Sequence, residues 1–349
     1  MPRVLKLIIT LVWLLLVGGC GTFDPVKVPT QTSGARLVWP KSPAEARIVY
    51  VRSVAGPQDL DIAKPFFRSV LDMLAGRGAE HFVRPTGVAV HDGVWYVADP
   101  GARALWILDA MRHRYVKVDA AGDTGLMSPV AVAVRPDGAV FVADTGLKKI
   151  FLFDRDGRLI GVAADADMER PAGLAYDAAR KRLYVVDSGK HRIAIYGADG
   201  KVVQTWGGGG DQSGQFNYPT HLALDGTGTL RVTDALNFRI QSFDRDGLFL
   251  GKFGHAGDGS GDLAGPKGIA TDSGGNIYVV DTLFDTVQIF DRNGIYLLAF
   301  GEQGTEAGQF WLPGGIFIDP QDEIYVTDGY NQRVQVFRVE HVAGKEVAK

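Results

Sequence analysis

Short runs of apolar residues recur along most of the chain and alternate with polar turns. Residues 277–280 (IYVV) and 287–290 (VQIF) are two such runs, and both are rich in β-branched and aromatic residues. Glycine-containing turns such as DSGG and DRNG precede and follow them. Runs of this length and composition, bounded by such turns, predict β-strands joined as hairpins. The pattern therefore predicts an all-β domain.

The runs are arranged in six copies of one sequence unit. Each copy opens with a proline, and its second apolar run ends in an aspartate. The prolines are Pro85, Pro129, Pro171, Pro219, Pro266 and Pro313, and the aspartates are Asp99, Asp144, Asp187, Asp234, Asp281 and Asp328. Successive prolines are 42 to 48 residues apart, a repeat length typical of propeller blades. The sequence predicts a six-bladed β-propeller of four-stranded blades, with its repeats at residues 84–339.

The predicted inner strands explain part of the high glycine content, which is 45 residues. Five of the six copies place a small residue at the start of this strand: Gly87, Ala131, Gly173, Gly268 and Gly315. Backbones crowd near the axis of a propeller, where glycine permits close approach.

Two segments, DALNFRIQSF and DGYNQRVQVF, carry a recognisable motif. The copies resemble the NHL repeat, whose motif runs roughly Pro-x-Gly-Ile-Ala-Val-Asp, then Tyr-Val-Ala-Asp, then Asn-x-Arg-Val-x-Val-Phe. The segments DTLFDTVQIF and DPGARALWIL lack the Asn and Arg of that motif. The resemblance implies the propeller fold over residues 84–339 and says little about chemistry.

The sixth copy stops at Val339, after three predicted strands. The upstream segment ARIVYVRSVAGP, at residues 46–57, looks like the missing outer strand and includes its terminal glycine. We expect this N-terminal strand to pair with the last blade and close the ring, which removes open sheet edges. The propeller would then span residues 46–340, followed by a tail at 341–349.

An insertion at residues 58–83 separates the closing strand from the first repeat. Phe67, Val70, Leu71 and Leu74 lie at helical spacing and predict one short inserted helix. We expect this helix to plug one face of the ring, and docking of a partner is the alternative.

Residues 1–19 are organised like a secretory signal peptide. Arg3 and Lys6 precede an apolar stretch at residues 7–17 that only Thr10 interrupts. The stretch is shorter than the roughly 20 residues needed to cross a bilayer. A cleaved signal is therefore favoured over a permanent membrane helix.

Cys20 is the only cysteine of the chain, so it cannot form an internal disulfide. The segment VGGC at residues 17–20 resembles the bacterial lipobox, in which the cysteine is acylated and becomes the mature N-terminus. Two or three acyl chains would give lasting membrane attachment. By the same resemblance, Gly21 in place of aspartate implies the outer membrane, facing the periplasm, in a Gram-negative cell. Residues 20–45, with four prolines, would form a tether. An ordinary cleaved signal with an accidental cysteine is the alternative.

Net charge restricts the class of partner. The chain has 37 basic and 40 acidic residues, and loss of residues 1–19 removes only Arg3 and Lys6, which leaves 35 against 40. A mildly acidic exported domain is a poor candidate for nucleic-acid binding, which depends on clustered Lys and Arg.

Candidate catalytic residues are few. Six aspartates at one repeated position are expected to accept hydrogen bonds from turn amides. Peptidyl-hydroxyglycine lyases resemble this propeller and bind zinc through histidines on the inner strands of different blades, but here only His221 occupies such a position. The Glu, Asn and Asp set of regucalcin-type lactonases does not align either. We therefore expect no metal, no cofactor and no catalytic residue, with a hydrolase or lyase site near His221 as the alternative.

The loops after the repeated aspartates differ from one another and should emerge on one face of the ring. Blades 4 to 6 place apolar side chains there: Leu236, Phe238, Leu283, Phe284 and Tyr330. Blades 1 to 3 place basic side chains there: Arg103, Lys148, Lys149, Lys190, His191 and Arg192. An apolar patch beside a basic arc is typical of a protein-binding surface. The alternative is that these side chains fold back onto neighbouring loops.

These observations favour a monomeric, lipid-anchored protein of the bacterial cell envelope. We expect it to act as a non-catalytic scaffold that binds another envelope protein or complex through the loop face. Glycan binding by the aromatic loops is a further alternative.

Overall fold

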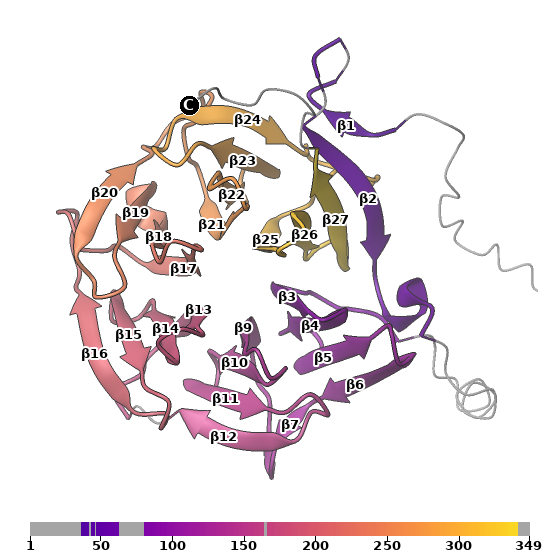
Figure 1. Cartoon of the computed structure of the whole chain (residues 1–349), viewed down its shortest axis with the longest axis vertical. Helices are drawn as coiled ribbons and strands as arrows, with labels where there is room; N and C mark the ends of the chain where they lie inside the picture. Colours follow the sequence, from indigo (N-terminus) through magenta and orange to yellow (C-terminus); the bar gives the residue numbers. More distant parts are fainter. Residues whose placement is uncertain (1–35, 42, 46, 63–79, 164–165, 341–349) are drawn as a thin grey trace, which may run out of the picture. The chain divides into compact units, whose positions relative to one another are not determined.

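The computed structural model describes residues 36–41, 43–45, 47–62, 80–163 and 166–340. The described residues from Leu37 to Glu340 form one compact unit, a ring of six antiparallel sheets (Figure 1). The helical turns of the described residues are the 3-10 turns η1 (Pro57–Leu60) and η2 (Ala235–Asn237). The predicted all-β, six-bladed propeller is therefore confirmed.

Several predicted features lie outside the described residues: the signal peptide at 1–19, Cys20, the helix expected within 58–83 and the tail at 341–349. In the part of the chain that is described, no helix has the length and apolarity needed to span a membrane.

Blades 1 to 5 are each a sheet of four consecutive strands, which follow one another from the channel outward. Blade 1 contains β3 (Gly87–His91), β4 (Val94–Asp99), β5 (Ala104–Asp109) and β6 (Arg114–Val118). Blade 2 contains β9 (Pro129–Val134), β10 (Val140–Asp144), β11 (Lys149–Phe153) and β12 (Leu159–Ala163). Blade 3 contains β13 (Pro171–Asp177), β14 (Arg182–Asp187), β15 (Arg192–Tyr196) and β16 (Val202–Gly207).

Blade 4 contains β17 (Pro219–Leu224), β18 (Leu230–Asp234), β19 (Arg239–Phe243) and β20 (Phe249–Phe253). Blade 5 contains β21 (Pro266–Thr271), β22 (Ile277–Asp281), β23 (Thr286–Phe290) and β24 (Tyr296–Phe300). A small hairpin of β7 (Ala120–Ala121) and β8 (Thr124–Gly125) lies in the connection between blades 1 and 2. Five of the inner strands begin at a repeat proline, which fits the absence of an N–H group at a strand start.

Blade 6 combines segments from both ends of the described chain. It contains β25 (Pro313–Ile318), β26 (Glu323–Asp328), β27 (Arg333–Val339) and β2 (Ile48–Val54). Strand β2 pairs antiparallel with β27, so the predicted closure of the ring by an N-terminal strand is confirmed.

A fifth strand, β1 (Val38–Trp39), adds to the outside of blade 6 by pairing with β2. Both residues fall in the segment at residues 20–45 that was predicted to be a tether. The ring of Trp39 lies 5.9 Å from that of Phe300 and 5.8 Å from that of Phe337. Aromatic packing thus holds this end of the tether segment on the propeller.

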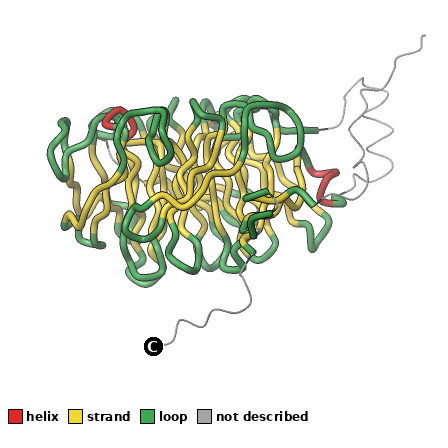
Figure 2. Tube along the Cα trace, turned by 90° about the horizontal axis from the view of Figure 1, so that it is seen from above, coloured by secondary structure: helices red, strands yellow, loops and turns green. Residues whose placement is uncertain are grey.

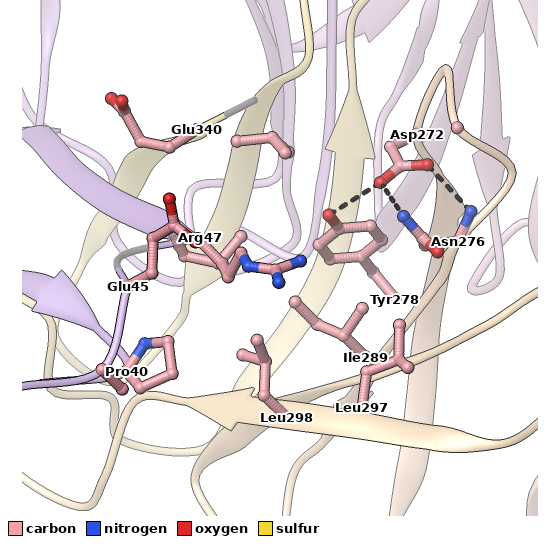
Figure 3. Close-up of a pocket in the computed structure, with 14 residues that line it drawn as sticks. Pro40, Glu45, Arg47, Asp272, Asn276, Tyr278, Ile289, Leu297, Leu298 and Glu340 are labelled. Carbon is pink, nitrogen blue, oxygen red and sulfur yellow. Dashed lines mark hydrogen bonds between the residues drawn. The ribbon is translucent and has the colours of Figure 1, made fainter. Parts of the chain in front are cut away.

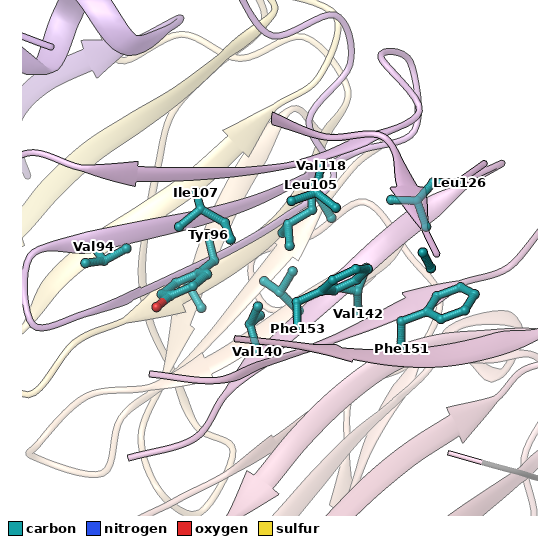
Figure 4. Packing of buried hydrophobic residues seen from close by; sticks show 14 residues of the cluster. Val94, Tyr96, Leu105, Ile107, Val118, Leu126, Val140, Val142, Phe151 and Phe153 are labelled. Carbon is teal, nitrogen blue, oxygen red and sulfur yellow. The ribbon is translucent and has the colours of Figure 1, made fainter. Parts of the chain in front are cut away.

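Burial explains the hydrophobic pattern of the repeats. The middle strands of a blade are covered on both faces by the neighbouring blades, and every residue of β4 is buried. The outer strand β16 instead alternates between half-buried and exposed positions. Each of the six seams between adjacent blades holds one hydrophobic cluster. Figure 4 shows the cluster between blades 1 and 2, where Tyr96 and Ile107 pack with Val140 and Phe153.

The inner strands crowd one another as predicted. A Cβ atom on Gly87 would lie 2.7 Å from the carbonyl oxygen of Val130, and one on Gly173 would lie 2.7 Å from the Cα of His221. Such distances are too short for a side chain, so glycine is required where one blade's inner strand meets the next.

The ring has two faces with different loops. We call the aspartate face the one that carries the loops after the six repeated aspartates and the connections between consecutive blades. It is the upper face in Figure 2, where η2 lies. The opposite side, formed by the remaining hairpin turns, is called the turn face.

Candidate functional site

The six repeated aspartates are buried, each at the end of the second strand of its blade. Each carboxylate accepts a hydrogen bond from the backbone N–H of the residue two positions before the proline of the same blade. These donors are Val83, Met127, Glu169, Asn217, Ala264 and Trp311. The expected hydrogen bonds to turn amides are thus present, and they fix the chain where it enters each inner strand.

In blade 6 the repeat motif adds three side chains to the buried carboxylate. The Nε of Arg333 lies 2.8 Å from Oδ2 of Asp328, and the side-chain amides of Asn331 and Gln335 donate to the same oxygen. The guanidinium also donates to the backbone carbonyl of Gln309, in the loop that enters the blade. Blade 4 repeats this arrangement with Asp234, Asn237, Arg239 and Gln241. The motif therefore fastens the connection between two blades.

Arg192 occupies the position of these structural arginines in blade 3. Its Nε lies 3.4 Å from Asp187, its Nη1 lies 3.1 Å from Asp167, and its side chain is 18% exposed. Lys190 also contacts Asp167, and its hydrogen bond lowers the pKa of that carboxyl. Nearby acids therefore pair with Lys190 and Arg192, while the Nδ1 of His191, the third blade-3 residue of the predicted basic arc, accepts a hydrogen bond from the backbone N–H of Tyr218.

The rest of the basic arc has a different environment. Arg103, Lys148 and Lys149 are exposed on the aspartate face. Within the described ranges, none of the three forms an ion pair. Their charges remain available to a partner.

The predicted apolar patch is divided by the structure into exposed and packed residues. Leu236, Leu283 and Tyr330 are 54%, 66% and 53% exposed. Phe238 is half-buried and packs against the cluster between blades 4 and 5, and Phe284 is also half-buried. The alternative for this patch was that its side chains fold back onto neighbouring loops. Among these residues, Phe238 fits that alternative best.

Trp311 is an exposed aromatic residue outside the predicted apolar patch. Its side chain is 46% exposed, and its ring centroid lies 5.6 Å from that of Tyr330. Its backbone N–H is bonded to Asp328, so it holds the same position in blade 6 as Met127 holds in blade 2. The spacing of two residues before each repeat proline was the sequence signal that could have identified it.

We call the crown the large apolar side chains exposed on the aspartate face. It consists of Val83, Met127, Leu236, Leu283, Trp311 and Tyr330. Four of its members belong to blades 4 to 6, and the uncompensated basic residues belong to blades 1 and 2.

His221 lies on β17 and is the one predicted channel residue. Its Nδ1 atom is buried and has no hydrogen-bond partner among the described residues. Burial, with a smaller contribution from the positive charge of Lys267, lowers the pKa of His221 to about 4, so the imidazole is neutral at pH 7. The described residues contain no group of three His, Cys, Asp or Glu side chains placed to hold a metal ion.

A pocket of ≈ 480 Å³ lies on the turn face, between blades 5 and 6 (Figure 3). Ile48 and Ile289 contribute to its apolar wall. Its buried carboxylate, Asp272, accepts hydrogen bonds from the side-chain amide of Asn276 at 2.8 Å and from the hydroxyl of Tyr278 at 3.0 Å. Because these polar groups satisfy one another, the cluster has a structural role. Another pocket, of ≈ 270 Å³, is lined by all six inner strands at the turn-face end of the channel.

Comparison with solved structures supports the fold. The chain resembles virginiamycin B lyase from Staphylococcus aureus, with 14% identity, a TM-score of 0.56, and coverage of 74% of this chain and 96% of that one. It resembles a gluconolactonase from Xanthomonas campestris with 17% identity, a TM-score of 0.56, and coverage of 74% and 87%. A chain of a nidogen/laminin complex matches with 19% identity, a TM-score of 0.52, and coverage of 70% and 86%. Likeness at these identities extends to the fold alone.

Comparison with family models and curated sequences gives one further result. No curated protein sequence matched the chain. The family model for the NHL repeat matches residues 168–196, in blade 3, and residues 310–337, in blade 6. Together with the six sheets of the ring, these matches show that the chain is a six-bladed β-propeller with NHL repeats in blades 3 and 6.

Proposed function

We propose that the protein is a membrane-anchored envelope lipoprotein that binds another envelope protein through the crown and does not itself catalyse a reaction. The exposure of six large apolar side chains on one face carries this proposal. Apolar surface exposed to water costs about 25 cal/mol per Å², and a partner that covers the crown would recover this free energy.

The crown is also held in place before any partner arrives. Val83, Met127 and Trp311 are fixed through their backbone amides by buried aspartates. A preorganised surface loses little conformational entropy on binding, which favours affinity. Trp and Tyr are the residue types most enriched among binding hot spots, so the pair of Trp311 and Tyr330 is the best candidate for an anchor.

The charges beside the crown favour an acidic partner surface. Arg103, Lys148 and Lys149 carry positive charges without an ion pair in the described part of the chain. Complementary charges mainly increase the rate and specificity of association.

The membrane anchor in this proposal rests on the sequence around Cys20. The 16 residues between Cys20 and Leu37 would connect the acyl chains to the outer edge of blade 6, where β1 lies. A flexible segment of this length has an average reach of roughly 20–25 Å. The propeller would therefore be able to reorient at the membrane surface while it binds a partner.

Two alternatives remain as competing hypotheses. A hydrolase or lyase site near His221 would need further ligands or a base, and the described residues offer no metal-binding group around it. Glycan binding is favoured by one observation, the Trp311 and Tyr330 pair, because paired aromatic rings can stack on a sugar.

Cross-linking in intact cells, followed by mass spectrometry of the retrieved proteins, tests the proposal. Trp311→Ala with Tyr330→Ala should abolish retrieval of a specific envelope protein without unfolding the ring, because truncating anchor residues typically costs about 2 kcal/mol or more. The matched control is Ile295→Ala with Leu297→Ala, which removes two apolar side chains that are 63% and 50% exposed outside the crown.

Unchanged retrieval by the crown variant, or equal loss in the control, would overturn the proposal. Loss of binding to isolated glycans, with no envelope protein retrieved by the wild type, would support the glycan alternative. A product formed by purified protein and lost with His221→Ala would support the enzyme alternative.

A further inference from the structure

Hydroxyl groups join most blades to their neighbours close to the channel. At five of the six seams, a Thr or Ser hydroxyl of one blade donates a hydrogen bond to a backbone carbonyl of the next. The donors are Thr86, Thr145, Ser188, Thr282 and Thr327, and their respective acceptors are Val130, Pro171, Pro219, Pro313 and Thr86. Among the described residues, the seam between blades 4 and 5 has no such bond.

This seam nevertheless contains the hydroxyl groups that could form one. Thr220 follows its repeat proline as Thr86 does, and Thr233 precedes its repeat aspartate as Thr327 does. The hydroxyl oxygens of both Thr220 and Thr233 are buried without a hydrogen-bond partner. Burying an unpaired hydroxyl costs about 1–3 kcal/mol, so two together at one seam require an explanation.

His221 adds a third unpaired polar atom to the same seam. It stands where other blades carry Gly87, Gly173 or Gly315, and a side chain at those glycines would collide with the backbone of the next blade. An imidazole fits at this level only if the inner strand of blade 5 leaves more room. The seam between blades 4 and 5 thus lacks the hydroxyl bond of the other five seams and carries an imidazole at a position where most blades carry glycine.

Lys267 supplies a positive charge on the inner strand of blade 5. It follows Pro266 on β21, and the equivalent residues of the other blades are uncharged: Thr86, Val130, Ala172, Thr220 and Gly314. No ion pair involves its ammonium group in the described part of the chain. The Lys267 side chain is exposed, and desolvation by the surrounding protein nevertheless lowers its pKa. Its charge also lowers the pKa of His221 on the neighbouring inner strand.

We propose that the seam between blades 4 and 5 binds a carboxylate, with the Lys267 ammonium balancing its charge while Thr220 and His221 donate hydrogen bonds to its oxygens. The hydroxyl of Thr233 is a further donor at the back of the site. A neutral imidazole leaves the site with one positive charge, which matches a carboxylate monoanion. A phosphate dianion would remain partly unbalanced, and a metal cation would be repelled by Lys267.

The carboxylate could belong to a free organic acid or to the C-terminus of a peptide that reaches the channel from the aspartate face. The same donors would serve both sources. The two can be separated by comparing acetate with a tetrapeptide that has either a free or an amidated C-terminus.

The experiment follows the imidazole resonances of His221 by NMR in the mature protein during titration with each probe. We expect acetate or the free tetrapeptide to shift these resonances in a saturable manner. Lys267→Met should raise the dissociation constant by at least about tenfold, because it removes the positive charge that balances the carboxylate. Thr220→Val should raise it by a smaller factor. The matched control Lys149→Met, which removes an exposed cation outside the seam, should leave it unchanged.

Binding of the free but not the amidated tetrapeptide, more tightly than acetate, would identify a peptide terminus as the source. Equal or tighter binding of acetate would identify a free acid. The absence of saturable shifts with both probes, or an unchanged dissociation constant in folded Lys267→Met, would overturn the proposal. Lys267→Gln serves as a second variant if the methionine variant does not fold.

This inference does not depend on the proposed protein partner. The variant with Trp311→Ala and Tyr330→Ala should retain carboxylate binding, while Lys267→Met should retain the crown. The two proposals can therefore fail separately.

Discussion

At the scale of single residues, neighbours in one loop have opposite roles. Leu236 is 54% exposed, whereas Phe238, two residues further on, packs against the cluster between blades 4 and 5. Phe238 has φ of 53°, in the left-handed region that turns the chain into β19. From hydrophobicity alone, both residues would be predicted to belong to the exposed patch. The direction of the turn decides that one is exposed and the other is packed.

Substitution of these two residues should separate packing from surface exposure. Phe238→Ala removes contacts with the seam cluster and should lower the free energy of unfolding by about 1–3 kcal/mol, less than for a fully buried phenylalanine. Leu236→Ala should change it by no more than about 0.5 kcal/mol. Urea unfolding of both variants measures the difference. Equal effects would show that Phe238 does not contribute to the core.

The stability of the ring should depend on the protonation of His221. Burial lowers its pKa to about 4 in the folded state from 6.5 in the unfolded chain. Between these values the unfolded chain binds a proton that the folded ring does not. The contribution of His221 is therefore fully present above pH 6.5 and decreases as the pH falls towards 4, by at most about 3 kcal/mol.

Urea unfolding at a series of pH values, with His221→Gln as the reference, isolates this contribution from that of the carboxylates. The stability of the variant relative to the wild type should rise as the pH falls from 7 to 4. A difference that does not change with pH would show that His221 titrates normally in the folded protein.

At the scale of the strands, closure of the ring depends on a segment far from the last repeat in sequence. Strand β2 covers the edge of β27, and its Ile48 and Val54 enter the clusters on either side of blade 6. The missing fourth strand of the last copy made this pairing predictable. The additional strand β1 was not predictable from a proline-rich segment, because its pairing depends on the aromatic surface offered by blades 5 and 6.

Deletion of residues 47–55 should leave β27 as an open edge and remove three buried hydrophobic residues, so we expect aggregation or a large loss of melting temperature. A chain that lacks only residues 37–45 should remain folded, because β2 still closes the ring. Light scattering and thermal unfolding compare the two. A soluble monomer with an unchanged melting temperature after the first deletion would refute the role of β2.

At the scale of the whole molecule, the propeller presents a preorganised face while the proposed membrane attachment lies in a separate segment. The six seams are built in the same way. The blades differ most in the loops of the aspartate face and in the polar groups at the seam between blades 4 and 5. Where one blade differs from the other blades of a regular repeat, the difference is a candidate for a functional role.

The anchor itself is tested by Cys20→Ser. This substitution removes the acylated thiol and should yield uncleaved or soluble protein that takes up no fatty-acid analogue during metabolic labelling. Membrane fractionation provides the second measurement. Equal labelling of the variant and the wild type would exclude acylation at Cys20.

The sequence by itself determined the ring: six copies, their strand pattern, the glycines at the crowded inner strands, the structural aspartates and the closing strand. These features could be predicted because each depends on local hydrogen bonding and burial that every copy repeats. Tertiary structure alone decided that Phe238 is packed and that Trp311 lies beside Tyr330. It also decided that polar atoms of Thr220, Thr233 and His221 are buried without hydrogen-bond partners at one seam. The physical reason is that exposure and pairing at a seam depend on how closely two blades approach, and that distance is set by residues far apart in the chain.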